Sequence, residues 1–149
     1  MNDENINYEE RVTVFIDILG FKEMLAETID NKGAPRQNKI NALIDAINAS
    51  TPGGMRNKAI IEVLYGCGLR VSELVNLKIS EVYQDEGFIK VIGKGNAERL
   101  VPIGSSALKY MLIYLSEIRV HNKIAEGYQD YIFLNNAGKN LSRIYIFKT

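Results

Sequence analysis

The stretch Gly66-Cys67-Gly68-Leu69-Arg70-Val71-Ser72-Glu73-Leu74 joins two predicted helices. The first helix, at residues 55–65, has an apolar stripe and stops at the glycines, which often end helices. The second helix opens at Ser72. Arg70 therefore projects from a rigid junction, where its planar guanidinium suits an oxyanion such as a phosphate, and Glu73 is placed to orient it. The alternative is a structural ion pair between Arg70 and a carboxylate.

A hairpin with a lysine at its tip is predicted downstream of this junction. The alternation of apolar and polar residues predicts strands at 88–92 and 99–103, joined by the turn Gly93-Lys94-Gly95-Asn96-Ala97. A lysine between glycines lets the backbone approach a polyanion closely, and Arg99 adds a second positive charge to the same arm. The alternative is that Lys94 merely keeps an exposed turn soluble.

The remaining segments predict a mainly helical α+β fold. A long helix at 106–121 is followed by a short strand at 131–134, and residues 142–149 are predicted to be helical. We therefore expect one antiparallel hairpin or a three-stranded sheet packed beside helices. The apolar stripe of the long helix consists of Leu108, Met111, Leu112, Leu115 and Ile118.

The chain is predicted to divide near Ser50-Thr51-Pro52-Gly53-Gly54. Before this break we expect a strand at 12–18 and two helices, the second starting at Pro35. Residues 1–50 carry five Lys and Arg against nine Asp and Glu, whereas residues 51–149 carry thirteen against nine. The two modules, 1–50 and 51–149, thus differ in the sign of their charge, and the second suits a nucleic-acid partner.

The composition argues against several classes of protein. A chain of 149 residues, 46% hydrophobic and 24% charged, is typical of a globular domain that buries a core without a metal or disulfide. The longest apolar run, residues 110–115, is too short for a bilayer, and the acidic start does not match a leader, so we expect a cytoplasmic protein. One cysteine, Cys67, and one histidine, His121, form no metal-ligand cluster. We predict no metal and no cofactor.

Four segments, in the same order, resemble the catalytic domain of tyrosine recombinases of the Xer and phage-integrase type. They are residues 56–74, 91–103, 131–134 and 138–143. The resemblance extends over residues 51–149 and implies a transesterification without metal or ATP, in which a tyrosine attacks a phosphodiester of double-stranded DNA. It implies that Arg70 grips the scissile phosphate and that Lys94 enters the minor groove and protonates the leaving oxygen. Arg99 is expected to be a further DNA contact.

The family pattern is incomplete in these residues. A recombinase of this type continues with a His-x-x-Arg motif, a His or Trp, and the nucleophilic tyrosine, whereas this sequence stops at Thr149. We therefore expect a truncated recombinase that binds DNA without cutting it, with no residue assigned as nucleophile. The alternative is a non-catalytic module that pairs with an intact recombinase or occupies its DNA site. We also expect the stripe of the 106–121 helix to be left uncovered by the missing later helices, so that either residues 1–50 cover it or the chain associates with itself.

Residues 14–22, Val-Phe-Ile-Asp-Ile-Leu-Gly-Phe-Lys, resemble the opening strand of class III nucleotide-cyclase-like domains. In such domains the aspartate, here Asp17, would hold a divalent ion. The second metal-binding aspartate on a later hairpin is absent, so Asp17 is predicted to be a strand-end carboxylate or a helix cap. Nucleotide binding by residues 1–50 is a third hypothesis.

Overall fold

The structure, a computed structural model, describes residues 44–148, with side chains described as far as residue 146. The strand predicted at 12–18, most of the two helices predicted before residue 50, and Asp17 lie outside the described residues. The described part is α+β and mainly helical, which confirms the predicted fold class.

The elements that lie wholly within the described residues are four helices, three strands and several short turns. The helices are α4 (Pro52–Cys67), α5 (Val71–Val75), α6 (Ser105–Ile113) and α7 (Arg143–Lys148). The strands are β1 (Val82–Tyr83), β2 (Phe88–Ile92) and β3 (Glu98–Pro102). Turns of 3-10 or π geometry are η1 (Ile79–Glu81), η2 (Lys94–Asn96), η3 (Tyr114–Ile118) and η4 (Arg119–His121).

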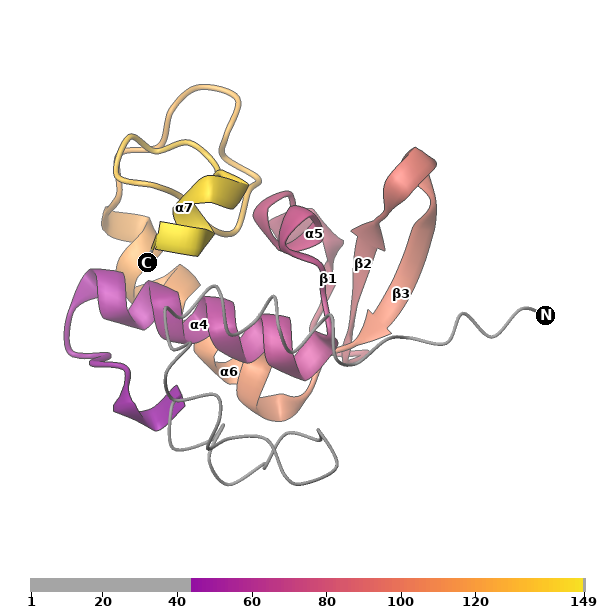
Figure 1. Cartoon of the computed structure of the whole chain (residues 1–149), viewed down its shortest axis with the longest axis horizontal. Helices are drawn as coiled ribbons and strands as arrows, with labels where there is room; N and C mark the ends of the chain where they lie inside the picture. Colours follow the sequence, from indigo (N-terminus) through magenta and orange to yellow (C-terminus); the bar gives the residue numbers. More distant parts are fainter. Residues whose placement is uncertain (1–43, 149) are drawn as a thin grey trace.

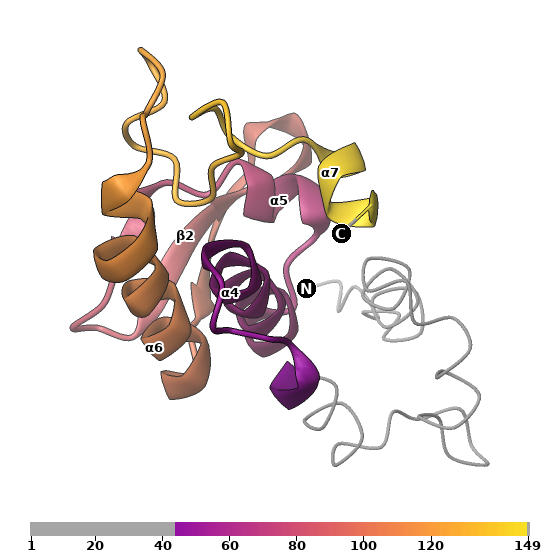
Figure 2. The ribbon, with the colours of Figure 1, turned by 90° about the vertical axis from the view of Figure 1, so that its left-hand side faces the viewer.

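Helices α4 and α6 lie side by side, and the sheet lies at one end of this pair (Figures 1 and 2). Helix α5 packs against both α4 and α7. The β2–β3 hairpin extends away from the helices, with its turn at the upper right of Figure 1. The turn at residues 93–97 therefore projects from the described part of the molecule.

Helix α4 begins and ends at residues suited to those positions. The hydroxyl of Thr51 accepts a hydrogen bond from the amide of Gly54 at 3.0 Å, and Pro52 occupies the first turn. The helix runs through Gly66 and ends at Cys67, because Gly68 adopts a left-handed backbone with φ of 58°. The helix is thus slightly longer at both ends than the predicted 55–65. Cys67 is buried, as expected for a small residue at the end of a core helix.

The sheet confirms the hairpin predicted around residues 93–97. Its strand order is β1-β2-β3, with antiparallel pairing that places Val91 opposite Arg99 and Ile92 opposite Glu98. Ile89 and Val91 are fully buried on one face of β2. Because residues directly opposite each other share a face, Arg99 lies on the inner face of the sheet.

The long helix predicted at 106–121 is present, but its geometry changes along its length from α to π to 3-10. The expectation that its apolar stripe is uncovered is wrong for most of the stripe. Met111 is fully buried and Leu112 is 36% exposed, while the other three stripe residues pack against the core. Helix α4 covers this face, so the exposed surface expected to favour self-association is largely missing.

Residues 131–134 do not form the predicted strand, and single bridges at Tyr131 and Leu134 take its place. The carbonyl of Tyr131 accepts a hydrogen bond from Arg119 at 3.0 Å, and that of Leu134 accepts one from Arg56 at 2.9 Å. The amide of Leu134 donates to the hydroxyl of Tyr114 at 3.2 Å. Because side chains satisfy these backbone groups, the segment needs no neighbouring strand.

Candidate nucleic-acid interface

Arg70 lies at the junction of α4 and α5 and is exposed. Its backbone is extended (φ −74°, ψ 150°), and its carbonyl accepts hydrogen bonds from the amides of Glu73 and Leu74, both at 3.0 Å. Its own amide donates to Oε2 of Glu73 at 2.8 Å. The backbone of Arg70 is therefore held on both sides, as the predicted rigid junction requires, and the side chain extends from it at the surface.

Glu73 is the buried centre of the site. Its side chain is 2% exposed, and its carboxylate binds the guanidinium of Arg99 as well as the amide of Arg70. Nη1 of Arg99 lies 2.5 Å from Oε1 and Nη2 lies 2.9 Å from Oε2, which is a bidentate ion pair. Glu73, predicted to orient Arg70, contacts the backbone of Arg70 and forms its ion pair with Arg99.

Two effects oppose each other in the pKa of Glu73. Burial of the carboxyl raises its pKa, whereas the hydrogen bonds from Arg99 and from the Arg70 amide, with the positive charges of both residues, lower it. The net effect lowers the pKa. The hydrogen bond to Glu73 also raises the pKa of Arg99 against the opposing effect of burial. Both groups are therefore ionised at neutral pH, and together they carry no net charge.

Lys94 lies in the projecting turn of the hairpin. The turn closes through a hydrogen bond from the amide of Gly93 to the carbonyl of Ala97, at 2.8 Å. It contains two residues with left-handed backbone, Gly95 (φ 72°) and Asn96 (φ 63°). Residues 94–97 are all exposed. The ammonium of Lys94 is thus presented by a narrow turn that has no side-chain bulk on either side of the lysine.

The structure brings Arg70, Glu73 and Arg99 into one cluster and places the base of the Lys94 turn against it. The contact is made at Gly93, where an added Cβ would lie 3.7 Å from Nη1 of Arg99 and 3.8 Å from Oε1 of Glu73. Lys94 is the next residue along the chain. Two exposed cations, Arg70 and Lys94, thus adjoin a neutral ion pair whose carboxylate is buried, and cations of this kind suit a phosphate backbone.

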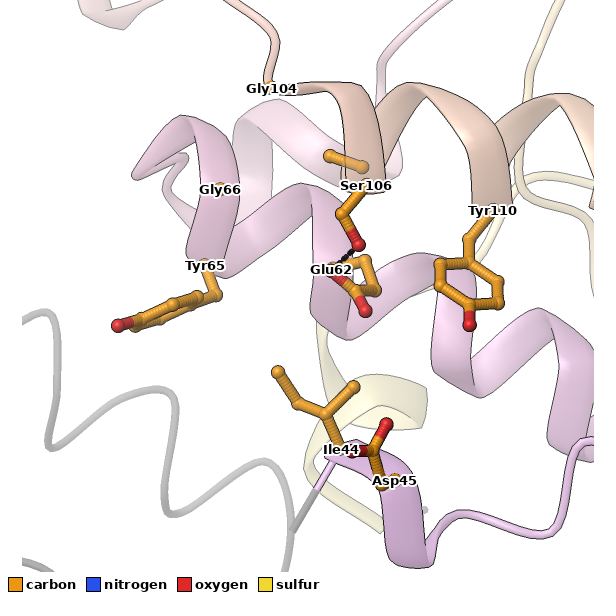
Figure 3. Close-up of a pocket in the computed structure, with 9 residues that line it drawn as sticks. Ile44, Asp45, Glu62, Tyr65, Gly66, Gly104, Ser106 and Tyr110 are labelled. Atoms are coloured by element: carbon orange, nitrogen blue, oxygen red, sulfur yellow. Dashed lines mark hydrogen bonds between the residues drawn. The ribbon is translucent and has the colours of Figure 1, made fainter. Parts of the chain in front are cut away.

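A separate hollow of about 430 Å³ lies between α4, α6 and residues 44–45 (Figure 3). Glu62, Ser106 and Tyr110 line it, and the hydroxyl of Ser106 donates to Oε2 of Glu62 at 3.0 Å. Lys58 beside the hollow pairs with Asp45 at 3.4 Å. None of the four predicted site residues lines this hollow, so it is not part of the candidate interface.

Within residues 44–148, no three His, Cys, Asp or Glu side chains are grouped so as to hold a metal ion. None of the helices described there has the length and apolarity that crossing a bilayer requires.

Comparison with known proteins gives the family of the chain. The model of the phage integrase family matches residues 35–149. The chain belongs to the phage integrase family. Among its relatives are tyrosine recombinase XerD of Listeria innocua, 40% identical over 104 residues, and XerD of Chlorobaculum tepidum, 47% identical over 90 residues. These matches cover 70% and 60% of this chain but 35% and 29% of the relatives, so this family member spans about a third of their length.

Solved structures confirm the resemblance to part of an Xer-type catalytic domain. This phage integrase family member superposes on XerA recombinase with a TM-score of 0.61 and 30% identity, over 74% of this chain and 37% of XerA. It superposes on XerH recombinase bound to a palindromic difH substrate with a TM-score of 0.65 and 26% identity, over 78% of this chain and 32% of XerH.

The pairing of Glu73 with Arg99 is the feature of this integrase-family site that sequence reasoning missed. The two residues are 26 positions apart and lie on different elements. The alternation of the predicted hairpin nevertheless contains a signal, since it places Arg99 on the same face as the apolar Val91 and Ile89. An arginine on a buried face needs a carboxylate partner.

Proposed function

We propose that this chain binds the phosphate backbone of double-stranded DNA through Arg70 and Lys94. The observation that carries the proposal is that both exposed cations adjoin the neutral Glu73–Arg99 pair, Arg70 through its own amide and Lys94 through the preceding Gly93. Because that pair is neutral, the positive charge available to a ligand comes from Arg70 and Lys94. XerH, which shares this fold, is bound to a difH substrate in its solved structure, and this supports a DNA ligand here.

A phosphodiester suits the two cations by charge and by shape. The guanidinium of Arg70 offers parallel N–H donors that match two phosphate oxygens, and Lys94 offers a compact ammonium on a narrow turn that can enter a groove. In a reacting phosphodiester, Arg70 would stabilise the charge that develops on the non-bridging oxygens. Lys94 would donate a proton to the leaving oxygen. These are the roles that the family resemblance implies.

Fluorescence anisotropy with a labelled duplex of about 30 base pairs tests the proposal. We expect a Kd of roughly 10⁻⁶ to 10⁻⁴ M at physiological salt, and a linear fall of log affinity with log salt concentration. Lys94→Gln and Arg70→Gln should each reduce the slope by about 0.9. Lys123→Gln removes an exposed lysine outside the hairpin and the junction, and it should keep the wild-type slope. Affinity that does not depend on salt, or an equal effect of all three variants, contradicts the proposal.

We further propose that these residues hold DNA without cutting it. A cut of the family type requires a tyrosine hydroxyl directed at the phosphate. Among the seven tyrosines in the described part of the chain, Tyr114 and Tyr145 have hydroxyls bound within the fold, the first by the amide of Leu134 and the second by Arg56. We expect no covalent adduct on a denaturing gel after incubation with a nicked suicide duplex. An adduct would overturn this second proposal and leave DNA binding unaffected.

Binding without cutting would make the chain a competitor of an intact recombinase at a shared DNA site. Added chain should then slow strand cleavage by an intact Xer-type recombinase, and Lys94→Gln should weaken this inhibition. A cleavage rate that stays constant when the chain saturates the DNA would exclude the inhibitory role.

A further inference from the structure

We infer that Arg99 is a positioning residue, which clamps the Lys94 hairpin to the junction that carries Arg70 and does not itself contact DNA. This inference rests on the proposed function and replaces the DNA contact that the sequence predicted for Arg99. On this inference, the Glu73–Arg99 pair sets the distance between Arg70 and Lys94, the two cations that bind phosphate.

The first observation is that the Glu73 carboxylate accepts three hydrogen bonds from groups of two elements. Oε1 accepts from Nη1 of Arg99, and Oε2 accepts both from Nη2 of Arg99 and from the amide of Arg70. One carboxylate with a 2% exposed side chain thus joins the first residues of α5 to β3. A bidentate ion pair fixes the direction as well as the distance between its partners, so Glu73 holds β3 in a set position relative to α5.

The second observation is that the clamp lies at the base of the turn that carries Lys94. Arg99 pairs with Val91 on β2, and the following pair, Ile92 with Glu98, is the last one before the turn. Gly93 lies against the ion pair, since a Cβ added to it would be within 4 Å of both Arg99 and Glu73. Lys94 follows directly, so movement of the clamp moves the lysine.

The third observation is that a direct DNA role would require Arg99 to leave Glu73. Both Nη atoms of Arg99 contact the carboxylate, and the side chain is 42% exposed. Moving the guanidinium to a phosphate would leave the Glu73 charge buried without its ion-pair partner, which is unfavourable. The pair also carries no net charge, so it attracts phosphate weakly.

The substitution Arg99→Lys distinguishes a clamp on Glu73 from a direct DNA contact. Lysine keeps the positive charge and can reach a phosphate as a point charge, but it cannot bridge both oxygens of Glu73. A DNA contact would survive this change, whereas a clamp would not. Glu98→Gln is the matched control, since it breaks the exposed Lys90–Glu98 ion pair of the same hairpin, at 3.4 Å, and leaves Glu73 untouched.

Amide hydrogen exchange in the free protein tests the clamp without DNA. In Arg99→Lys and Arg99→Gln we expect the amides of Gly93 and Arg70 to exchange faster by roughly tenfold. The amide of Ile132, bonded to the carbonyl of Leu77 at 3.0 Å, should keep its wild-type rate. Glu98→Gln should change none of the three. If Gly93 and Arg70 keep their rates in both Arg99 variants, the clamp is refuted.

Salt titrations of DNA affinity test whether the clamp positions Lys94. In the wild-type background, Lys94→Gln should lower the salt slope by about 0.9, which is about 3.5-fold in affinity across a fourfold change of salt. In the Arg99→Lys background, the same substitution should lower the slope by less than half as much, because Lys94 is no longer held in place. A full effect of Lys94→Gln in both backgrounds overturns the positioning role. If the wild-type chain binds no DNA, the proposed function fails, while the exchange rates still support or refute the clamp.

Discussion

The hydroxyl of Tyr145 on α7 accepts a hydrogen bond from the guanidinium of Arg56 on α4, 89 positions earlier in the chain. Arg56 is 7% exposed, and its other terminal nitrogen, Nη1, donates to the carbonyl of Leu134 at 2.9 Å. Its guanidinium carbon also lies 5.0 Å from the centre of the Tyr145 ring. A single buried arginine thus holds together α4, the segment at residues 131–134 and α7.

Removal of the Tyr145 hydroxyl is expected to destabilise the fold. In Tyr145→Phe, Nη2 of Arg56 loses its acceptor, and Nε already has no hydrogen-bond partner among the described residues. We expect the free energy of unfolding to fall by about 1–3 kcal/mol in urea denaturation. Tyr83→Phe, at a position that is 38% exposed, is the control and should stay within about 0.5 kcal/mol of wild type. Equal losses in the two variants would show that the Arg56 contact contributes nothing.

The lowered pKa of Glu73 predicts that acid destabilises the fold through this carboxyl. The unfolded chain binds a proton near the ordinary value of 4.5, while the folded carboxyl resists protonation, so stability falls as the pH drops below about 5 and through the folded pKa. Glu73→Gln should be less stable than wild type at pH 7 and should lose less stability on acidification to pH 3. Urea denaturation at a series of pH values measures both. The prediction fails if wild type and Glu73→Gln lose stability in parallel on acidification. Glu98→Gln, which removes an exposed carboxyl of the β2–β3 hairpin and leaves Glu73 in place, is the control.

Burial raises the pKa of the Cys67 thiol to about 11, from an ordinary value of 9.0. The folded state therefore keeps its proton where the unfolded state loses it, and stability should fall as the pH rises from 9 to 11, by up to about 2–3 kcal/mol. Cys67→Ala should abolish this part of the alkaline loss. Urea denaturation between pH 8 and 11 checks the prediction, and identical slopes for the two proteins would contradict it.

Substitutions at Gly138 and Gly127 allow the energetic cost of steric overlap to be measured apart from that of backbone strain. Both have left-handed backbone, with φ of 72° and 84°. An added Cβ at Gly138 would lie 2.1 Å from the carbonyl oxygen of Lys123, whereas at Gly127 it would meet nothing within 4 Å. We expect Gly127→Ala to cost about 1–2 kcal/mol and Gly138→Ala to cost more than about 3 kcal/mol in urea denaturation. Similar losses would show that backbone conformation alone limits both positions.

Much of the fold was predictable because it depends on short-range patterns. The end of α4 at Gly68, the start of α5 before Glu73 and the hairpin turn at 93–97 all follow from residues a few positions apart. The strand predicted at 131–134 failed for a long-range reason. Its apolar residues are typical of a buried strand, but Arg56 and Arg119 bind its carbonyls from distant parts of the chain.

In the candidate site, too, the features that depend on neighbouring residues were predictable and the long-range contact was not. The exposure of Arg70 and Lys94 was predictable, since one follows a helix-ending glycine and the other lies in a glycine-flanked turn. The partner of Glu73 was not, because Arg70 is three residues away and Arg99 is 26 residues away, and the carboxylate binds both through different atoms.

The sequence by itself determined the order of the helices, the hairpin and the family, since each depends on residue types at short, fixed spacings. Tertiary structure alone decided that Arg99 turns inward to Glu73, that residues 131–134 stay irregular, and that α4 covers the long helix. The physical reason is that a buried charge or carbonyl takes whichever partner folding brings within reach, and the spacing of residues along the chain does not encode that choice.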